Sequence, residues 1–354
     1  MKVQLPFRQA ILDRRTYEAP AEGRAGKIRL DFNENTAGCP AASLRALRAL
    51  GAKQIAMYPE YEASARRLAR YFGVRREELL LANGGDDALR VFFDTFVDAG
   101  SRVLICEPTF PMYRYYAEIY GARIETLRYD SRMQFPLPAA LAALRRGPRL
   151  MFIANPNNPT GTLLSQAEIA RILRAAPRTA VVLDEAYAEF SGASAVPWIS
   201  RYPQLFVART FSKAAGLAGL RLGAVIANAR SLALLRRAMP PFPVNIAAMV
   251  AAEAAIREGR SIRAYVRRTI CLREWFAAEL NRLGIVTYPS AGNFLLANFG
   301  PGGPKLFAAL ERNGILLRDR SRDMGPGFVR ITIGTPAEMR KLLAAIRGRW
   351  QGER

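Results

Sequence analysis

Histidine is absent: none of the 354 residues of the chain is His. Its absence excludes Ser-His-Asp triads, histidine general bases and histidine-ligated metal sites as the basis of function. Any proton transfer that the protein performs must therefore use a Lys, Asp, Glu, Tyr or Cys side chain.

Cysteines and long apolar runs are also scarce. The three cysteines, Cys39, Cys106 and Cys271, are odd in number and far apart, which fits a reducing cytoplasm and neither a disulfide framework nor a zinc site. No apolar run is long enough to span a bilayer, and the first eight residues lack the apolar block of a signal peptide. We therefore expect a cytoplasmic protein with no metal site and no membrane partner.

Lysine is scarce as well, although the formal net charge is +22. Only six lysines occur among the 52 basic residues, and the arginines are spread from end to end with no basic tail. This distribution indicates an amino-acid usage biased towards arginine, so we expect no nucleic-acid partner. A basic nucleic-acid binder is the alternative, and a strongly salt-dependent affinity for DNA would reveal it.

The order of the predicted elements indicates an α/β fold. Short apolar strands alternate with helices over residues 79–227, which is the pattern of a doubly wound, mostly parallel sheet. Ligands of such sheets bind outside the carboxyl ends of the strands, where polar motifs follow several of these strands. The predicted strands are 79–82, 103–106, 124–127, 150–154, 180–183, 205–208 and 222–227.

Composition divides the chain into three predicted segments. Residues 1–40 read as an N-terminal arm and loop, residues 41–235 as a large domain, and residues 236–354 as a smaller α+β domain. A proline-rich connector at 239–244 marks the second boundary. The smaller domain is predicted to hold one long helical stretch at 245–283, strands near 286–298, 315–318 and 328–333, and a final helix at about 336–348.

The most informative stretch is residues 210–223. Lys213 lies there between small and hydroxyl residues, and a desolvated lysine has a lowered pKa and an amine that attacks carbonyl groups. Arg221, with Ser212 and Thr210 nearby, is a natural clamp for a phosphate. A carbonyl-reactive lysine beside a phosphate clamp suggests pyridoxal 5'-phosphate (PLP) as cofactor. A buried, salt-bridged lysine is the plain structural alternative.

A glycine-rich turn after the predicted strand 79–82 is a second candidate for phosphate binding. It leads into an apolar helix, and this arrangement points free backbone N–H groups of Gly85, Asp86 and Asp87 at an anion. An ordinary strand–helix turn is the alternative.

Three motifs together carry a family resemblance. They are NPNNPTG at 155–161, DEAY at 184–187, and TFSK at 210–213 followed by GLRLG at 219–223. With them the chain resembles the PLP-dependent aminotransferases of fold type I, class I/II, and within these the histidinol-phosphate aminotransferase branch. The resemblance covers nearly the whole chain. It implies the PLP-transferase fold, a large domain with a mostly parallel sheet plus a smaller α+β domain, with residues 1–40 forming part of the substrate site.

The resemblance also implies roles around the cofactor. Lys213 would hold PLP as a Schiff base and shuttle a proton, while Asp184 would pair with the pyridinium nitrogen. Asn158 and Tyr187 match the residues that hydrogen-bond the phenolic oxygen, and Phe110 matches the ring that stacks on the cofactor. Asp184 as a helix N-cap and Phe110 as a core residue are the plain alternatives.

For the phosphate, Arg221 and Ser212 match the family's clamp, with Thr210 and the amides of the glycine-rich turn in support. Tyr58 resembles the tyrosine that reaches the phosphate of the neighbouring subunit, which implies a homodimer with shared active sites. A surface tyrosine in a turn is the alternative for Tyr58.

For the substrates, Arg330 and Arg318 match two anion-binding arginines, and Asn33 and Tyr17 fall near positions that line the substrate site. A surface role is the alternative for Arg318. The implied reaction is a ping-pong transamination through a Lys213 aldimine, with histidinol phosphate and 2-oxoglutarate giving imidazole-acetol phosphate and glutamate. Thr36 replaces a proline that is common in the branch, and Phe110 replaces its usual tyrosine.

Other functions on the same scaffold stay open. An aromatic or other amino-acid aminotransferase and a phosphothreonine decarboxylase would keep the same lysine. A PLP-binding transcription regulator would need an N-terminal DNA-binding domain, which we do not expect here because the Asn33-Glu34-Asn35 motif begins at residue 33.

Overall fold

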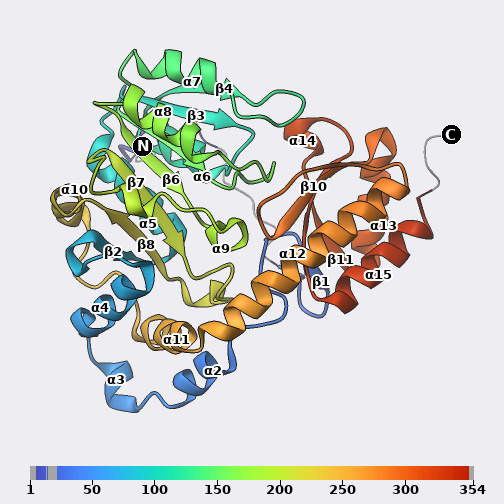
Figure 1. Cartoon of the computed structure of the whole chain (residues 1–354), viewed down its shortest axis with the longest axis horizontal. Helices are drawn as coiled ribbons and strands as arrows, with labels where there is room; N and C mark the ends of the chain where they lie inside the picture. Colours follow the sequence, from blue (N-terminus) through green and yellow to red (C-terminus); the bar gives the residue numbers. More distant parts are fainter. Residues whose placement is uncertain (1–4, 13, 15–21, 351–354) are drawn as a thin grey trace.

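The structure, a computed structural model, describes residues 5–12, 14 and 22–350. Figure 1 shows two parts, a larger one around the strands β2–β8 and a smaller one around β9–β12. The long helix α12 (Gly259–Arg282) runs from the larger part into the smaller one (Figure 1).

The larger part is built on a seven-stranded sheet with the strand order β2-β8-β7-β6-β5-β3-β4. Every neighbouring pair is parallel except those of β8, which is antiparallel to both β2 and β7. The predicted α/β fold with a mostly parallel sheet is thus confirmed. The strands are β2 (Leu79–Ala82), β3 (Arg102–Glu107), β4 (Arg123–Arg128), β5 (Leu150–Ala154), β6 (Ala180–Asp184), β7 (Leu205–Thr210) and β8 (Gly223–Ala227).

Helices cover both faces of this sheet because its strands are apolar on both sides, as parallel strands in such folds are. In β2, Leu79 and Leu81 point into one hydrophobic core, and Leu80 and Ala82 point into the other. The first face is covered by α4 (Tyr61–Phe72), α7 (Leu137–Leu144), α8 (Gln166–Ala175), α11 (Ile246–Arg257) and the start of α12. The second face is covered by α5 (Gly84–Phe96), α6 (Met112–Ile119) and α10 (Ala229–Leu235).

The smaller part is a five-stranded sheet with the order β1-β11-β12-β10-β9. It encloses a third core against the end of α12, to which Phe276 and Leu280 contribute. The strands are β1 (Ile28–Leu30), β9 (Val286–Tyr288), β10 (Phe294–Asn298), β11 (Ile315–Asp319) and β12 (Phe328–Thr332). Helices α13 (Gly303–Arg312) and α15 (Pro336–Arg347) pack on this sheet through buried leucines.

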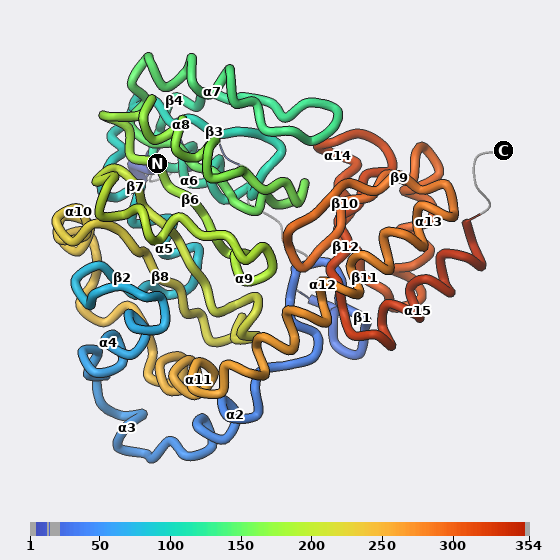
Figure 2. The backbone as a smooth tube through the Cα atoms, viewed as in Figure 1, coloured from blue at the N-terminus to red at the C-terminus, as the bar shows by residue number. Residues whose placement is uncertain are grey.

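Two features of the smaller part differ from the sequence prediction. Strand β1 was not predicted, yet it pairs in parallel with β11 and contributes Leu30 to the third core. The helical stretch predicted at 245–283 is two helices, because the backbone leaves the helical conformation at Glu258. Figure 2 follows the chain from β1 across to α2 (Ala41–Arg48), so the N-terminal segment joins the two parts.

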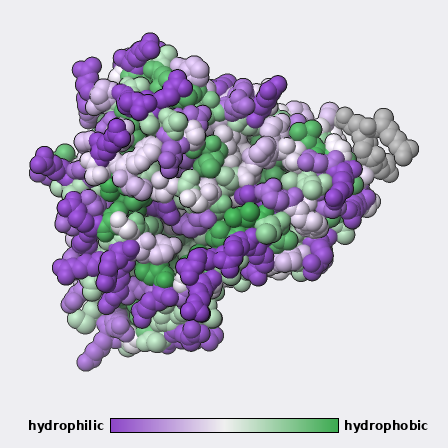
Figure 3. Space-filling view, viewed as in Figure 1, coloured by the Kyte–Doolittle hydropathy of each residue, from purple (hydrophilic) through white to green (hydrophobic). Residues whose placement is uncertain are grey.

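The remaining helices are short. They are α1 (Gln9–Leu12), α3 (Ala52–Ala56), α9 (Ala188–Ser191) and α14 (Ser321–Met324), with 3-10 turns at Arg76–Glu78, Val196–Trp198, Ala218–Leu220, Arg236–Ala238 and Gly300–Gly302. Hydrophilic side chains dominate the face of the molecule that Figure 3 shows. Among the described residues, no helix is long and apolar enough to cross a membrane.

Two glycines allow the backbones of β8 and the β2–α5 turn to touch. A Cβ atom on Gly223 would lie 2.4 Å from the carbonyl oxygen of Gly84, far inside normal contact distance. Gly84 has φ +83°, and a Cβ atom there would lie 2.6 Å from a guanidinium nitrogen of Arg221. The positive φ and this close packing require glycine at residue 84.

We expect Gly223→Ala to lower the free energy of unfolding by about 1–3 kcal/mol, the usual cost of overpacking a close-packed site. Urea unfolding followed by far-UV circular dichroism measures this change. Gly219→Ala is the matched control: nothing lies within 4 Å of a Cβ atom there, so the change should stay within about 0.5 kcal/mol. Equal stability of the Gly223 variant and the parent protein would contradict the packing argument.

Candidate active site

One edge of the large sheet gathers the polar motifs. The carboxyl ends of β2, β3, β5, β6 and β7 meet there, and because β8 is antiparallel, its start also lies at this edge. A cavity of about 480 Å³ opens at that edge and extends to the β11 and β12 strands of the small sheet. The sequence-predicted residues that line this cavity are Gly85, Asp86, Phe110, Asn158, Asp184, Tyr187, Thr210, Ser212, Lys213, Arg221, Arg318 and Arg330.

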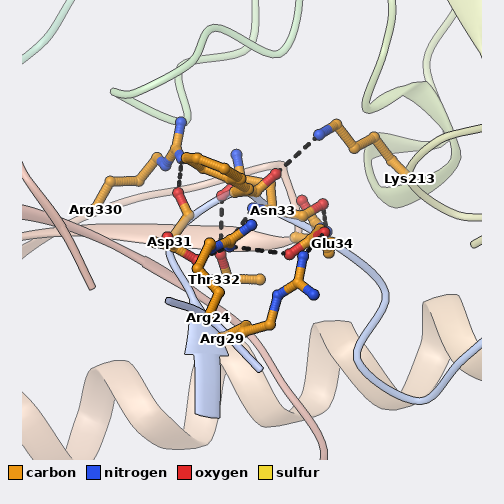
Figure 4. A network of polar contacts seen from close by, with 10 residues as sticks. Arg24, Arg29, Asp31, Asn33, Glu34, Lys213, Arg330 and Thr332 are labelled. Carbon is orange, nitrogen blue, oxygen red and sulfur yellow. Dashed lines mark hydrogen bonds and ion pairs between the residues drawn. The ribbon is translucent and has the colours of Figure 1, made fainter. Parts of the chain in front are cut away.

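Lys213 follows β7 and reaches into the cavity. Its Nζ donates a hydrogen bond of 3.0 Å to the carbonyl oxygen of Phe32 (Figure 4). Burial, with the positive charge of Arg330 as a further cause, lowers the pKa of Lys213 from 10.5 to about 8. About a tenth of this amine is therefore neutral at pH 7 and about half at pH 8, and the neutral amine is the form that acts as a nucleophile or proton acceptor.

Asp184, the last residue of β6, presents a carboxylate to the cavity. Its Oδ2 accepts a hydrogen bond of 2.7 Å from the hydroxyl of Tyr113, and its Oδ1 accepts one from the backbone N–H of Ala186. Burial raises the pKa of Asp184 above its usual value, and these two donors oppose that rise. A buried, hydrogen-bonded carboxylate of this kind can pair with a protonated ring nitrogen.

The anion-binding end lies where α5 begins. The first N–H groups of this helix have no partner within the helix, and Arg221 reaches across them to bond Asp86 at 2.8 Å. Ser212 completes this end, because its hydroxyl accepts a hydrogen bond from Thr210 and both line the cavity. The side chain of Asp87 lies outside the cavity lining, where it accepts from the backbone N–H of Asn83, so only its amide can serve a ligand.

Three arginines lie at the opposite, small-sheet end. Arg318 and Arg330 are directly paired across β11 and β12, so their side chains project from the same face of the sheet. Arg320, two residues beyond Arg318, also lines the cavity and was not predicted. Arg330 is buried; it donates to Asn158 Oδ1 at 2.6 Å and to the carbonyl oxygen of Asp31.

The positive charges of these three arginines repel one another. Burial lowers the pKa of Arg330 to about 10, and the charges of Arg320 and Arg318 contribute to the shift. Like charges directly opposite one another destabilise a sheet unless an anion lies between them. The Nε atom of Arg330 is buried and has no hydrogen-bond partner among the residues that the structure describes. The arrangement is therefore suited to an anionic ligand.

Residues 31–34 form the wall between the two ends (Figure 4). Arg24 pairs with Asp31 at 2.5 Å, both buried, and with Glu34 at 3.2 Å, and its guanidinium lies 3.9 Å from the ring centre of Phe32. Phe32 and Glu34 line the cavity, although the sequence analysis did not single them out.

Asn33 corrects one prediction. It was expected near the substrate site, but it is fully buried and its side chain does not line the cavity. Its Nδ2 donates 2.9 Å to the hydroxyl of Tyr187, and its Oδ1 accepts from Thr332, so its side chain positions Tyr187. The positive φ of 54° turns the backbone here and is a conformation that Asn tolerates.

Two other predicted residues lie away from the cavity. Tyr58 is 78% exposed, stacks on Phe242 with ring centres 4.5 Å apart, and does not line the cavity of its own chain. Tyr17 lies outside the described residues. Among the described residues, no group of three or more Cys, Asp or Glu side chains is placed to hold a metal ion.

The residues present fit PLP. The phosphate could bind between Arg221 and the N–H groups at the start of α5. At Gly84, beside them, the packing leaves no space for a Cβ atom. The pyridine ring could lie on Phe110 with its nitrogen at Asp184, and the carbonyl carbon could meet the amine of Lys213.

Comparison with known proteins agrees with this chemistry. The sequence profile of the family "Aminotransferase class I and II" matches residues 25–346. The chain belongs to this family. The resemblance drawn from the motifs is therefore confirmed, and with it the fold of type I and the dependence on PLP.

Individual relatives point to one branch of the family. The chain is 36% identical to histidinol-phosphate aminotransferase of Symbiobacterium thermophilum over 90% of each protein. It is similar to the crystal structure of the Sinorhizobium meliloti histidinol-phosphate aminotransferase in complex with PLP, with a TM-score of 0.89 and 25% identity over 98% and 99% of the two chains. L-threonine-O-3-phosphate decarboxylase of Porphyromonas gingivalis is also similar, with a TM-score of 0.79 and 26% identity over 91% and 98%.

The lowered pKa of Lys213 predicts how its reactivity depends on pH. In protein stripped of PLP, we expect acetic anhydride to label Lys213 with a midpoint near pH 8, because the amine is protonated below that pH and neutral above it. Arg330→Gln should move the midpoint upward, since the arginine charge helps to lower the pKa. Peptide mass spectrometry at a series of pH values measures both midpoints. A midpoint near pH 10.4, that of an ordinary lysine, would contradict the effect of burial.

Proposed function

We propose that this chain is a cytoplasmic aminotransferase that moves the amino group of histidinol phosphate to 2-oxoglutarate, giving imidazole-acetol phosphate and glutamate in two half-reactions. Lys213, Asp184 and the start of α5 support the transamination chemistry. The similar proteins from S. thermophilum and S. meliloti carry the name of this activity.

The observation that carries the substrate proposal is the cross-strand pair of Arg318 and Arg330. Two guanidinium groups on one face, with Arg320 beside them, match a doubly charged phosphate better than a single carboxylate. A phosphorylated amine would bind with its phosphate here and its amino group towards Lys213, while the carboxylates of glutamate would use the same arginines.

Cofactor binding falls to a defined set of side chains. Asp184 would pair with the ring nitrogen, Phe110 would cover one face of the ring, and Arg221 and Ser212 would hold the phosphate. Asn158 and Tyr187 lie at the cavity wall where they can hydrogen-bond the phenolic oxygen. When bound, PLP supplies an electron sink for negative charge at the substrate Cα.

Proton transfer would fall to Lys213. With a pKa of about 8, its amine can accept a proton from the substrate Cα and deliver it, within the same half-reaction, to the carbon of PLP that carried the aldehyde. The carbonyl oxygen of Phe32 gives Nζ a fixed partner at 3.0 Å and so orients it. No imidazole can replace it, because the chain contains no histidine.

A phosphothreonine decarboxylase is the second candidate. It is favoured by the similarity to the P. gingivalis enzyme and by the same arginine cluster, which would accept its phosphate equally well. The two activities differ in which bond at Cα breaks, so the products separate them.

We expect histidinol phosphate to change the absorbance of bound PLP at least about tenfold faster than histidinol, since one charge-assisted hydrogen bond is worth roughly that factor. Arg318→Gln should remove most of this preference, because Arg318 faces the cavity. Stopped-flow absorbance measures the half-reaction, with phosphothreonine, phenylalanine and glutamate as further amines.

The neighbouring Arg322 gives the matched control, because it is exposed on α14 and does not line the cavity. Arg322→Gln should keep the preference for the phosphorylated amine. A Lys213→Ala protein should not complete the half-reaction with any amine, because the group that moves the proton is missing. Carbon dioxide release from phosphothreonine, or a failure of histidinol phosphate to react, would overturn the choice of substrate.

We also propose a homodimer in which Tyr58 reaches the phosphate site of the partner. Tyr58 and Phe242 form an exposed aromatic pair, and Met57 and Ile55 beside them are more than 60% exposed. Such an apolar patch is typical of a protein–protein contact. Because Tyr58 does not line its own cavity, its predicted contact with PLP requires a second chain.

Phe242→Glu should weaken the dimer, because it places a charge in the exposed aromatic pair. Sedimentation velocity at a series of concentrations should show a parent protein of twice the mass of one chain and a variant that dissociates at low concentration. Val286→Glu, which adds the same charge to an exposed residue of β9, should leave the dimer intact. A monomeric parent protein would rule out the shared site.

A further inference from the structure

We propose that Tyr113 is a positioning residue for the cofactor: it keeps Asp184 ionised and aimed at the ring nitrogen, and it sets the tilt of Phe110. The proposal rests on the proposed function, since it assigns Asp184 and Phe110 to the PLP ring. The sequence analysis did not single out Tyr113, whose place on α6 looks like that of any core aromatic residue.

The ring of Tyr113 is held rigidly. It is fully buried and stacks on Phe152 of β5, with ring centres 4.9 Å apart and planes 8° apart. Phe93 of α5 also stacks on Phe152, with ring centres 5.2 Å apart and planes 18° apart. This aromatic stack leaves the hydroxyl as the polar end of Tyr113, and that end points at the site.

The hydroxyl reaches Asp184 at 2.7 Å, within the normal range for such a bond. Tyr113 donates, because a carboxylate can only accept. The donor favours the charged form of Asp184 and opposes the effect of burial, which raises the pKa of this carboxyl group. The other charged groups that act on Asp184 are Asp86, which raises its pKa, and Lys213, which lowers it.

Tyr113 also touches the residue proposed to cover the cofactor. Its ring meets Phe110 edge to face, with centres 5.8 Å apart and planes 83° apart. The spacing of three residues brings Phe110, before α6, next to Tyr113 in its first turn. One buried side chain thus contacts both the group at the ring nitrogen and the group at the ring face.

The tilt of Phe110 matters here because phenylalanine has no hydroxyl to anchor it. Its ring can be oriented only by packing, and the edge-to-face contact with Tyr113 supplies such packing.

The test is Tyr113→Phe, which keeps the ring and removes only the hydroxyl. Without the donor, Asp184 should take up a proton at a higher pH and lose its pairing with the ring nitrogen. As the pH is lowered from 8 to 5, the dissociation constant of PLP, measured by equilibrium dialysis, should therefore begin to rise at a higher pH in the variant than in the parent protein. We expect PLP binding to be about tenfold weaker at the acid end.

A double-mutant cycle separates positioning from general structure. In an Asp184→Asn background the hydroxyl no longer acts on a carboxylate, so adding Tyr113→Phe should not move the pH dependence of PLP binding further. Tyr202→Phe removes the hydroxyl of another buried tyrosine that does not line the cavity and should leave PLP binding unchanged.

The outcomes are distinct. If the parent protein fails to bind PLP, the proposed function fails. If the parent binds PLP and Tyr113→Phe gives the same dissociation constants at every pH, only the role of Tyr113 is overturned. A shift that persists in the Asp184→Asn background would also overturn it, because the effect would not pass through the carboxylate.

Discussion

Buried cations need hydrogen-bond acceptors, and in this protein the backbone of residues 31–34 provides them. The carbonyl oxygen of Phe32 accepts from Lys213, and that of Asp31 accepts from Arg330. A neutral acceptor satisfies the donor without cancelling its charge, so both cations keep their attraction for an anionic ligand. The ion pair of Arg24 with Asp31 holds the segment in place, and through it the large and small sheets share one cavity.

The large sheet and its functional edge could be predicted because parallel strands carry strong local signals. Most of its strands are short apolar runs, and polar residues that the topology brings together follow β2, β3, β5, β6 and β7. Lys213, Asp184 and Asn158 meet in the cavity for this reason. Their convergence needed no knowledge of side-chain contacts, only the order and direction of the strands.

Other features had no local signal. Strand β1 is three residues long, too short to show a period, and its pairing with β11 depends on the distant end of the chain. The hydrogen bond between Tyr113 and Asp184 joins α6 to the end of β6, and no pattern near Tyr113 in the sequence indicates it. Asn33 was placed near the site, but its bond to the hydroxyl of Tyr187 joins residues 154 positions apart, and no local pattern indicates such a contact.

The pairing of β1 with β11 determines when the N-terminal segment can fold during synthesis. Ile28 pairs with Ile315, so Leu30 stays uncovered until almost the whole chain has left the ribosome. At typical rates of synthesis the wait is on the order of 15 to 60 s. The seven strands of the large sheet are complete by Ala227 and can pair earlier. The wall of residues 31–34 is continuous with β1, so the catalytic cavity is closed last, by a segment that was among the first to be synthesised.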